Sequence, residues 1–300
     1  MEHDAGTRRQ GLLAAAALLS VTAAWGSTFF LIKDLVEVVP PLDFLAVRFA
    51  IAAVALFLLR PRAVLALSGD ALKRGVVLGL VYGAAQILQT VGLAHTAASV
   101  SGFVTGMYVV FTPILAALVL RQRIGAPVWI AVVVATVGLG FLSLDGLSIG
   151  YGEGITLLSA VLYAAHIVML GAWTSAREAY ALAVVQMAVI SVMCLIMTAP
   201  GGVTLPQTGG QWLSMVYMAL VAGAFAMLAQ TWAQAHLPAT RAAIIMSMEP
   251  VFAAAFAIGF TAESLTLRTL LGGGMVLAAM LIAEAVPRRH VEAEVPHLSQ

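Results

Sequence analysis

The chain has 300 residues, of which 62% are hydrophobic and only 10% are charged, and its mean hydropathy is +1.01. Soluble domains are far more polar. A transmembrane helix needs about 20 apolar residues, so this composition supplies about ten spans and excludes a soluble enzyme, a nucleic-acid-binding protein and a disordered scaffold. The formal net charge of +1 indicates no particular partner, and the single cysteine, Cys194, excludes a disulfide framework.

Apolar runs of spanning length follow one another along the chain, separated by charged residues, prolines or glycines. They cover residues 11–33, 42–60, 71–93, 98–120, 126–144, 151–173, 179–199, 211–235, 238–260 and 267–286. The runs are continuous rather than alternating, which excludes a β-barrel and predicts helices. We therefore predict an all-α polytopic membrane protein with ten transmembrane helices.

Basic residues are distributed unequally between the two ends of these spans. If the N-terminus is cytoplasmic, twelve lysines and arginines fall on the cytoplasmic side, and only Lys33 and Arg268 fall outside. Cytoplasmic loops carry the excess of positive charge, so both termini are predicted inside and the loop around Gly146 outside. Two lysines against thirteen arginines are typical of a GC-rich bacterial gene. The expected location is the bacterial inner membrane.

The two halves of the chain resemble each other at a shift of 141 residues, which aligns Gln89 with Gln230 and His95 with His236. Each half holds five spans, an odd number, so the two copies enter the membrane in opposite directions. Inverted repeats of this kind are typical of secondary transporters, which bind substrate near the membrane midplane. The predicted organisation is a first five-helix repeat (1–145), a second, inverted repeat (146–287) and a cytoplasmic tail (288–300).

Polar side chains form stripes on the first, third, fourth, sixth, eighth and ninth spans. Polar residues in lipid usually face the interior of the bundle, so these six helices are expected to line a cavity. The fifth and tenth spans are apolar and are expected at the periphery. The candidate substrate-binding residues are Trp25, Ser27, Tyr82, Gln86, Gln89, Thr105, Tyr108, Tyr163, His166, Gln230, Gln234 and Glu249.

Each candidate also has a structural alternative. Serine and threonine hydroxyls often bond a carbonyl of their own helix, and glutamines commonly join neighbouring helices. Aromatic side chains can mark the membrane interface. However, Trp25, Tyr82, Tyr108 and Tyr163 fall near the middle of their spans, which favours the cavity.

Two charged residues fall within the predicted spans. Glu249 precedes Pro250 near the middle of the ninth span, where a charge costs roughly 2.5–3.5 kcal/mol. It either binds substrate or stabilises a helix break at the proline. Arg48, near the outer end of the second span, is expected to extend toward the interface. We therefore expect a cavity with one acidic group and without lysine or arginine.

Glycines and histidines in the spans favour structural roles. Gly75, Gly79 and Gly83 are spaced four residues apart, which indicates close helix contact. His95 and His236 are predicted at opposite membrane faces, so no metal site is expected. The chain also lacks the P-loop and HExxH patterns. We expect no cofactor and no catalytic residue.

Several short motifs resemble, in their order, EamA-type members of the drug/metabolite transporter superfamily. They are Trp25-Gly26-Ser27-Thr28-Phe29, Arg48-Phe49-Ala50, Thr105-Gly106-Met107-Tyr108-Val109-Val110-Phe111-Thr112-Pro113, Met248-Glu249-Pro250-Val251-Phe252 and Ala262-Glu263-Ser264-Leu265. In length and topology the chain is similar to the ten-helix amino-acid exporters of the YddG kind. The resemblance implies a 5+5 inverted repeat, alternating access and export of small metabolites from the cytoplasm.

Three functions remain open at this point. The first is export of amino acids or similar small zwitterionic metabolites, with Glu249 as a negative pole. The second is export of drug-like organic cations, which aromatic rings and one carboxylate also suit. The third, from another class, is an intramembrane enzyme, which would yield a reaction product. The expected partners are a small-molecule substrate and the lipid bilayer.

Overall fold

The computed structural model describes residues 2–96, 98–120, 125–143, 150–260 and 267–285. All secondary-structure elements within these ranges are helical, which confirms the predicted all-α class. The loop around Gly146, the 262–265 motif and the 288–300 tail lie outside the described residues.

The first half of the chain forms the first five spans, two of them from pairs of helices. Its helices are α1 (Glu2–Gly26), α2 (Phe29–Val36), α3 (Pro41–Leu59), α4 (Pro61–Leu65), α5 (Gly69–Ala94), α6 (Ala98–Gly106), α7 (Tyr108–Val119) and α8 (Ala126–Ser143). Helices α1 and α2 form the first span and α6 and α7 the fourth. Helix α4 is a short connection that the hydropathy pattern did not predict.

The second half forms the other five spans. Its helices are α9 (Tyr151–Trp173), α10 (Ala179–Thr198), α11 (Gly209–Ala219), the π-helical turn η1 (Leu220–Phe225), α12 (Ala226–Gln234), α13 (Ala239–Met246), α14 (Glu249–Phe260) and α15 (Leu267–Ala285). The eighth span comprises α11, η1 and α12, and the ninth comprises α13 and α14. Six helical stretches of the described chain, among them the combined residues 9–36 and 209–234, are long and apolar enough to cross a membrane.

Local signals begin several of these helices. Pro41 is the first residue of α3, a position where proline's missing amide hydrogen is not needed. The Ser68 hydroxyl accepts a hydrogen bond from the Ala71 amide at 3.2 Å and caps α5. Thr208 and Gln211 form a reciprocal capping box at the start of α11. Apolar composition decides the spans, and these residues decide where the helices begin.

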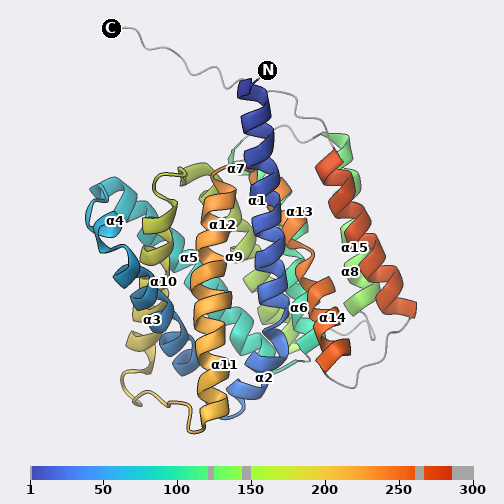
Figure 1. The fold of residues 1–300 in the computed structure, drawn as a ribbon. Coiled ribbons are helices and arrows are strands. Elements are labelled where there is room, and N and C mark those ends of the chain that lie inside the picture. The colour runs from blue at the N-terminus through green and yellow to red at the C-terminus, as the bar shows by residue number, and fades with distance from the viewer. Residues whose placement is uncertain (1, 97, 121–124, 144–149, 261–266, 286–300) are drawn as a thin grey trace, which may run out of the picture.

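The spans stand side by side in one bundle, and consecutive spans run in opposite directions (Figure 1). Helix α1 begins and α15 ends at the same end of the bundle. Gln89 lies in the last part of α5 and its repeat mate Gln230 in the last part of α12, and these two helices end at opposite ends of the bundle. Equivalent helices that run in opposite directions agree with a fold of two inverted five-helix repeats.

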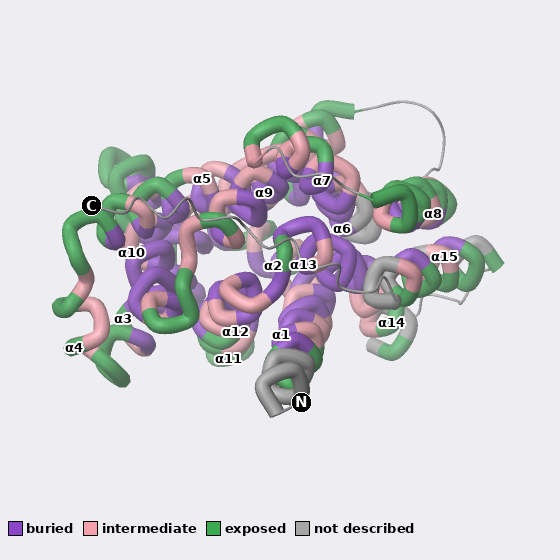
Figure 2. The backbone as a smooth tube through the Cα atoms, turned by 90° about the horizontal axis from the view of Figure 1, so that it is seen from above, coloured by how far each residue is buried: buried purple, intermediate pink, exposed green. Residues whose placement is uncertain are grey.

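The edges of the bundle contain the helices expected there. The fifth and tenth spans, α8 and α15, pack against each other at one edge, as the apolar pattern predicted (Figure 2). Near the other edge, α5 packs closely on α10 through its regularly spaced glycines. A Cβ atom on Gly79 would lie 2.7 Å from the Cβ of Val189, so only glycine allows this approach. The predicted glycine contact is therefore confirmed.

Three spans are interrupted near the middle. The first breaks at Ser27 and Thr28, the fourth at Met107, and the ninth at Ser247 and Met248. The last two breaks are repeat mates, because Met107 and Met248 are 141 residues apart.

The predicted break at Pro250 lies slightly earlier in the chain. Pro250 is the second residue of α14 rather than the cause of a kink inside a helix. Tyr108 and Glu249 each follow one of the repeat-related breaks, and they are the first residues of α7 and α14.

Candidate substrate-binding cavity

A cavity lies between the two repeats, and both halves contribute to its wall. The lining residues are Trp25, Thr28, Phe29, Ile32, Arg48, Tyr82, Gln86, Gln89, Thr90, Leu93, Thr105, Tyr108, Tyr163, Ile167, Gln230, Met246 and Glu249. They come from the six spans that carry polar stripes and, through Arg48, from the second span. Nine of the twelve predicted site residues are in this wall, and the three others, Ser27, His166 and Gln234, are not.

Ser27 and Gln234 join helices beside the cavity. The Ser27 hydroxyl lies 2.6 Å from that of Tyr217, which connects the first span to α11. Gln234 donates to the carbonyl oxygen of Ile167 at 3.0 Å and accepts from Gln230 at 3.0 Å. The Gln234 contact to Ile167 is the interhelical role considered for glutamines from the sequence. The Ser27 hydroxyl also donates to the Ala24 carbonyl oxygen at 2.7 Å, the bond within its own helix considered for serines.

His166 is fully buried behind the aromatic wall. Its Nε2 atom lies 2.7 Å from Oε1 of Gln186 on α10. Its ring centroid lies 4.7 Å from that of Tyr82, with the planes tilted by 32°. His166 therefore supports a lining residue without lining the cavity itself.

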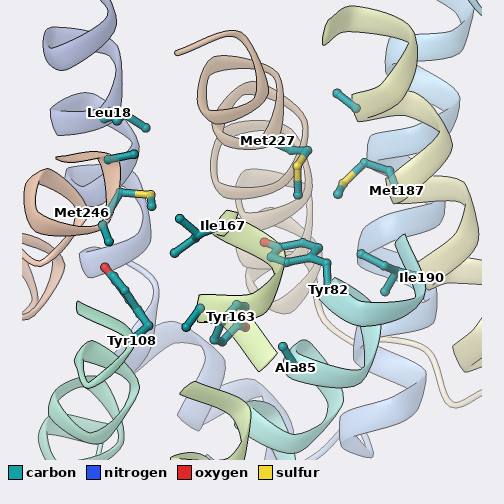
Figure 3. Packing of buried hydrophobic residues seen from close by; sticks show 14 of the residues in the cluster. Leu18, Tyr82, Ala85, Tyr108, Tyr163, Ile167, Met187, Ile190, Met227 and Met246 are labelled. Carbon is teal, nitrogen blue, oxygen red and sulfur yellow. The ribbon is translucent and has the colours of Figure 1, made fainter. Parts of the chain in front are cut away.

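Aromatic rings form one side of the cavity. The centroids of Tyr82 and Tyr163 are 5.7 Å apart at an interplanar angle of 61°, an edge-to-face arrangement (Figure 3). The Tyr163 hydroxyl donates to Oε1 of Gln89 at 2.7 Å, and Nε2 of Gln89 donates to the Thr105 hydroxyl at 3.1 Å. This network connects α9, α5 and α6, so the ring position depends on both repeats.

Glu249, Tyr108 and Gln230 contribute polar groups to the cavity wall. The carboxyl group of Glu249, a residue that is 5% exposed, lies beside the Tyr108 hydroxyl. The Tyr108 hydroxyl and Oε1 of Gln230 are buried and have no hydrogen-bond partner of suitable geometry in the described part of the chain. Buried polar atoms are normally hydrogen-bonded, so Oε1 of Gln230 is available to a ligand, whereas the Tyr108 hydroxyl faces the Glu249 carboxyl group.

Arg48 also lines the cavity, contrary to the expectation that it extends to the interface and that the cavity holds no cation. The residue is only 3% exposed. Its Nε and Nη2 atoms each donate at 3.2 Å, to the carbonyl oxygens of Met218 and Ala222. The guanidinium carbon lies 5.1 Å from the centroid of the Phe49 ring. Arg48 is the functional candidate that sequence reasoning missed.

The shape of the eighth span explains why Arg48 remains inside. The π-helical turn η1 is wider than an α-helical turn and leaves carbonyl oxygens accessible to side chains. The Ala222 oxygen accepts from Arg48 and also, at 3.0 Å, from the indole nitrogen of Trp25. Every residue of η1 is apolar or glycine, so the amino-acid sequence of the eighth span did not predict a π-helical turn. The family-like Arg48-Phe49-Ala50 motif was the only available hint.

Arg48 and Glu249 are the two charged side chains in the wall, and they are not paired with each other. Lys73 pairs with Asp70 and Arg74 with Glu178, and both of these ion pairs are away from this cavity. The cavity therefore presents one basic and one acidic side chain together with aromatic rings and amides.

Two inverted five-helix repeats around a polar cavity, with helices broken beside it, define a membrane transporter. The chain belongs to the EamA-like transporter family, which residues 12–144 and 150–284 each match. An uncharacterized transporter of Archaeoglobus fulgidus is 33% identical over 277 residues, covering 90% of this chain and 85% of that protein. A solved crystal structure with 14% identity superposes with a TM-score of 0.74, covering 90% of this chain and 96% of the other, which shows the shared fold.

Proposed function

We propose that the protein is a secondary transporter that exports amino acids or similar small zwitterionic metabolites from the cytoplasm. The observation that carries this proposal is the composition of the cavity wall, which holds one cation, one carboxyl group, aromatic rings and amides. A zwitterion carries both charges, so each of its charged groups has a complementary group in the wall. The residues of the wall, including Gln86 and Gln230, would supply further hydrogen bonds.

Alternating access would use the breaks in the fourth and ninth spans. The breaks at Met107 and Met248 are repeat mates and stand beside the cavity residues Tyr108 and Glu249. Broken helices at the repeat interface are a recurring feature of such carriers. An exchange of conformation between the two repeats would open the cavity to each side in turn.

Export of organic cations is the second candidate, because the tyrosines and Glu249 would also attract a cation. Arg48 argues against it. A buried guanidinium in the same wall repels a ligand that carries only positive charge, and this repulsion is strong where the dielectric constant is low. A zwitterion avoids the penalty.

We also propose that both termini are cytoplasmic, in a bacterial inner membrane, with repeats 1–145 and 146–287 and a cytoplasmic tail at 288–300. The exposed basic residues Arg60, Arg62 and Lys73 support this orientation. They lie in or next to α4 and the start of α5, toward the end of the bundle where α1 begins (Figure 1). Positive charge at one end is the usual signature of the cytoplasmic side.

Uptake into proteoliposomes tests the proposed substrate class. Purified protein is supplied with labelled amino acids, organic cations and sugars, and empty liposomes serve as the control. We expect transport of unmodified amino acids. Transport of cations alone would establish the second candidate instead.

The Glu249→Gln variant tests the negative pole. The amide keeps the size and hydrogen bonding of the side chain, so the folded yield should match the wild type. Transport of an amine-bearing substrate should fall about tenfold or more, since a hydrogen bond to a charged group is lost, while a neutral analogue is less affected. The matched control is Glu37→Gln, at an exposed position after α2. Wild-type rates for both substrates, or failure to fold, would show that Glu249 is structural.

A further inference from the structure

We propose that Arg48 binds the carboxylate of the transported substrate. It forms the positive pole of the cavity, and Glu249 forms the negative pole. This inference rests on the proposed function, in which the substrate is a small zwitterion. It names the residue that distinguishes such a substrate from the corresponding amine.

The electrostatic situation of Arg48 supports this assignment. The guanidinium is buried, and no carboxylate of the described chain pairs with it. Its hydrogen-bond acceptors are two neutral carbonyl oxygens, each at 3.2 Å, the long end of the range for such bonds. A buried cation is costly unless it is paired with a negative charge. A carboxylate entering the cavity would supply the missing charge.

The donor geometry also fits a carboxylate. A guanidinium has five N–H donors in a planar fork that matches the two oxygens of a carboxylate. The two hydrogen bonds to Met218 and Ala222 use one donor from Nε and one from Nη2. Three donors are left for a ligand in a cavity that Arg48 lines.

Arg48 is also held in position without a ligand. The guanidinium carbon lies 5.7 Å from the ring centroid of Phe44 and 5.1 Å from that of Phe49. Phe49 in turn packs edge-on against Tyr82, a lining residue, at 6.4 Å. A donor fixed by neighbouring rings and carbonyls loses little freedom when a ligand binds, which favours affinity.

The competing interpretation is that Arg48 only holds the π-helical turn of the eighth span against α3. The two interpretations differ in their substrate dependence. A purely structural role affects every substrate equally, whereas a carboxylate-binding role affects only substrates that carry a carboxylate.

The experiment compares three substrates in proteoliposomes containing the wild type, Arg48→Gln or Arg48→Lys. They are phenylalanine, phenethylamine, which lacks the carboxylate, and benzoate, which carries a carboxylate but no amine. We expect Arg48→Gln to lower phenylalanine transport about 10- to 100-fold, the effect of losing a charged hydrogen bond, and to spare phenethylamine. Arg48→Lys keeps the charge but loses the fork and should lie between. Arg74→Gln, which removes a partly exposed cation paired with Glu178, is the matched control.

Equal losses for phenylalanine and phenethylamine would overturn the assignment, and so would failure of both Arg48 variants to fold as judged by gel filtration. The wild-type measurements separate this inference from the proposed function. If the wild type transports benzoate but no zwitterion, the proposed substrate class is wrong, and sensitivity of benzoate transport to Arg48→Gln still supports the carboxylate site. If the wild type transports only phenethylamine, both proposals are wrong.

Discussion

Replacing Gly26 with alanine should disturb the contact between the end of α1 and the start of α14. A Cβ atom at this position would lie 2.7 Å from the amide nitrogen of Ala253, 2.8 Å from Cβ of Phe252 and 2.9 Å from the carbonyl oxygen of Glu249. Two of these three neighbours are backbone atoms, which cannot rotate away as a flexible side chain could. The two helices must therefore separate.

The expected cost follows from overpacking of a close contact. Inserting a methyl group into a well-packed interior costs about 1–3 kcal/mol, and the backbone clash places Gly26→Ala at the upper end of that range. The displacement also moves the first turn of α14, which carries Glu249, so transport should fall together with stability.

Thermal unfolding in detergent and uptake in proteoliposomes measure the two effects. The control is Gly154→Ala in α9, where a Cβ atom meets nothing within 4 Å. Alanine is the better helix former, so this control should be as stable as the wild type or more stable. If Gly26→Ala unfolds at the wild-type temperature and transports normally, the close α1–α14 contact does not position Glu249.

Two further predictions concern the ends of the bundle. Lys33 donates to the carbonyl oxygen of Thr96 at 2.6 Å, and the Thr96 hydroxyl donates to Glu153 at 2.5 Å, so Glu153→Ala should lower the free energy of unfolding by about 1 kcal/mol. Lys73→Ala, which removes an exposed ion pair, should have almost no effect in the same denaturation assay. Equal stability of the two variants would show that the hydrogen bonds through Thr96 do not stabilise the fold. In a Cys194→Ala background, a cysteine introduced at Ser148 should react with an impermeant thiol reagent added to intact cells, and labelling only after lysis would reverse the proposed orientation.

The hydropathy pattern and the internal repeat of the sequence were sufficient to predict most of the fold. Continuous apolar runs predict spans because lipid solvates no backbone polar group, and a shift of 141 residues with an odd number of spans predicts inversion. Polar and aromatic residues in mid-span, such as Tyr82, Gln89 and Glu249, were placed at the cavity for the same reason: lipid disfavours them. The placement of each polar residue needs only its own chemistry and that of the surrounding lipid, without knowledge of its neighbours in space.

Interactions between distant residues required the tertiary structure. His166 and Gln234 have the polarity of lining residues, but their partners on α10 and α9 place them behind the wall. Arg48 lies near the end of its span in the sequence, where an arginine side chain is expected to extend to the membrane interface. The carbonyl oxygens that hold it inside belong to Met218, near the end of α11, and to Ala222 in the π-helical turn, 170 and 174 residues later in the chain. The sequence alone predicts that a charged side chain within a membrane span needs a partner. Only the packing of the helices decides which group lies close enough to be that partner.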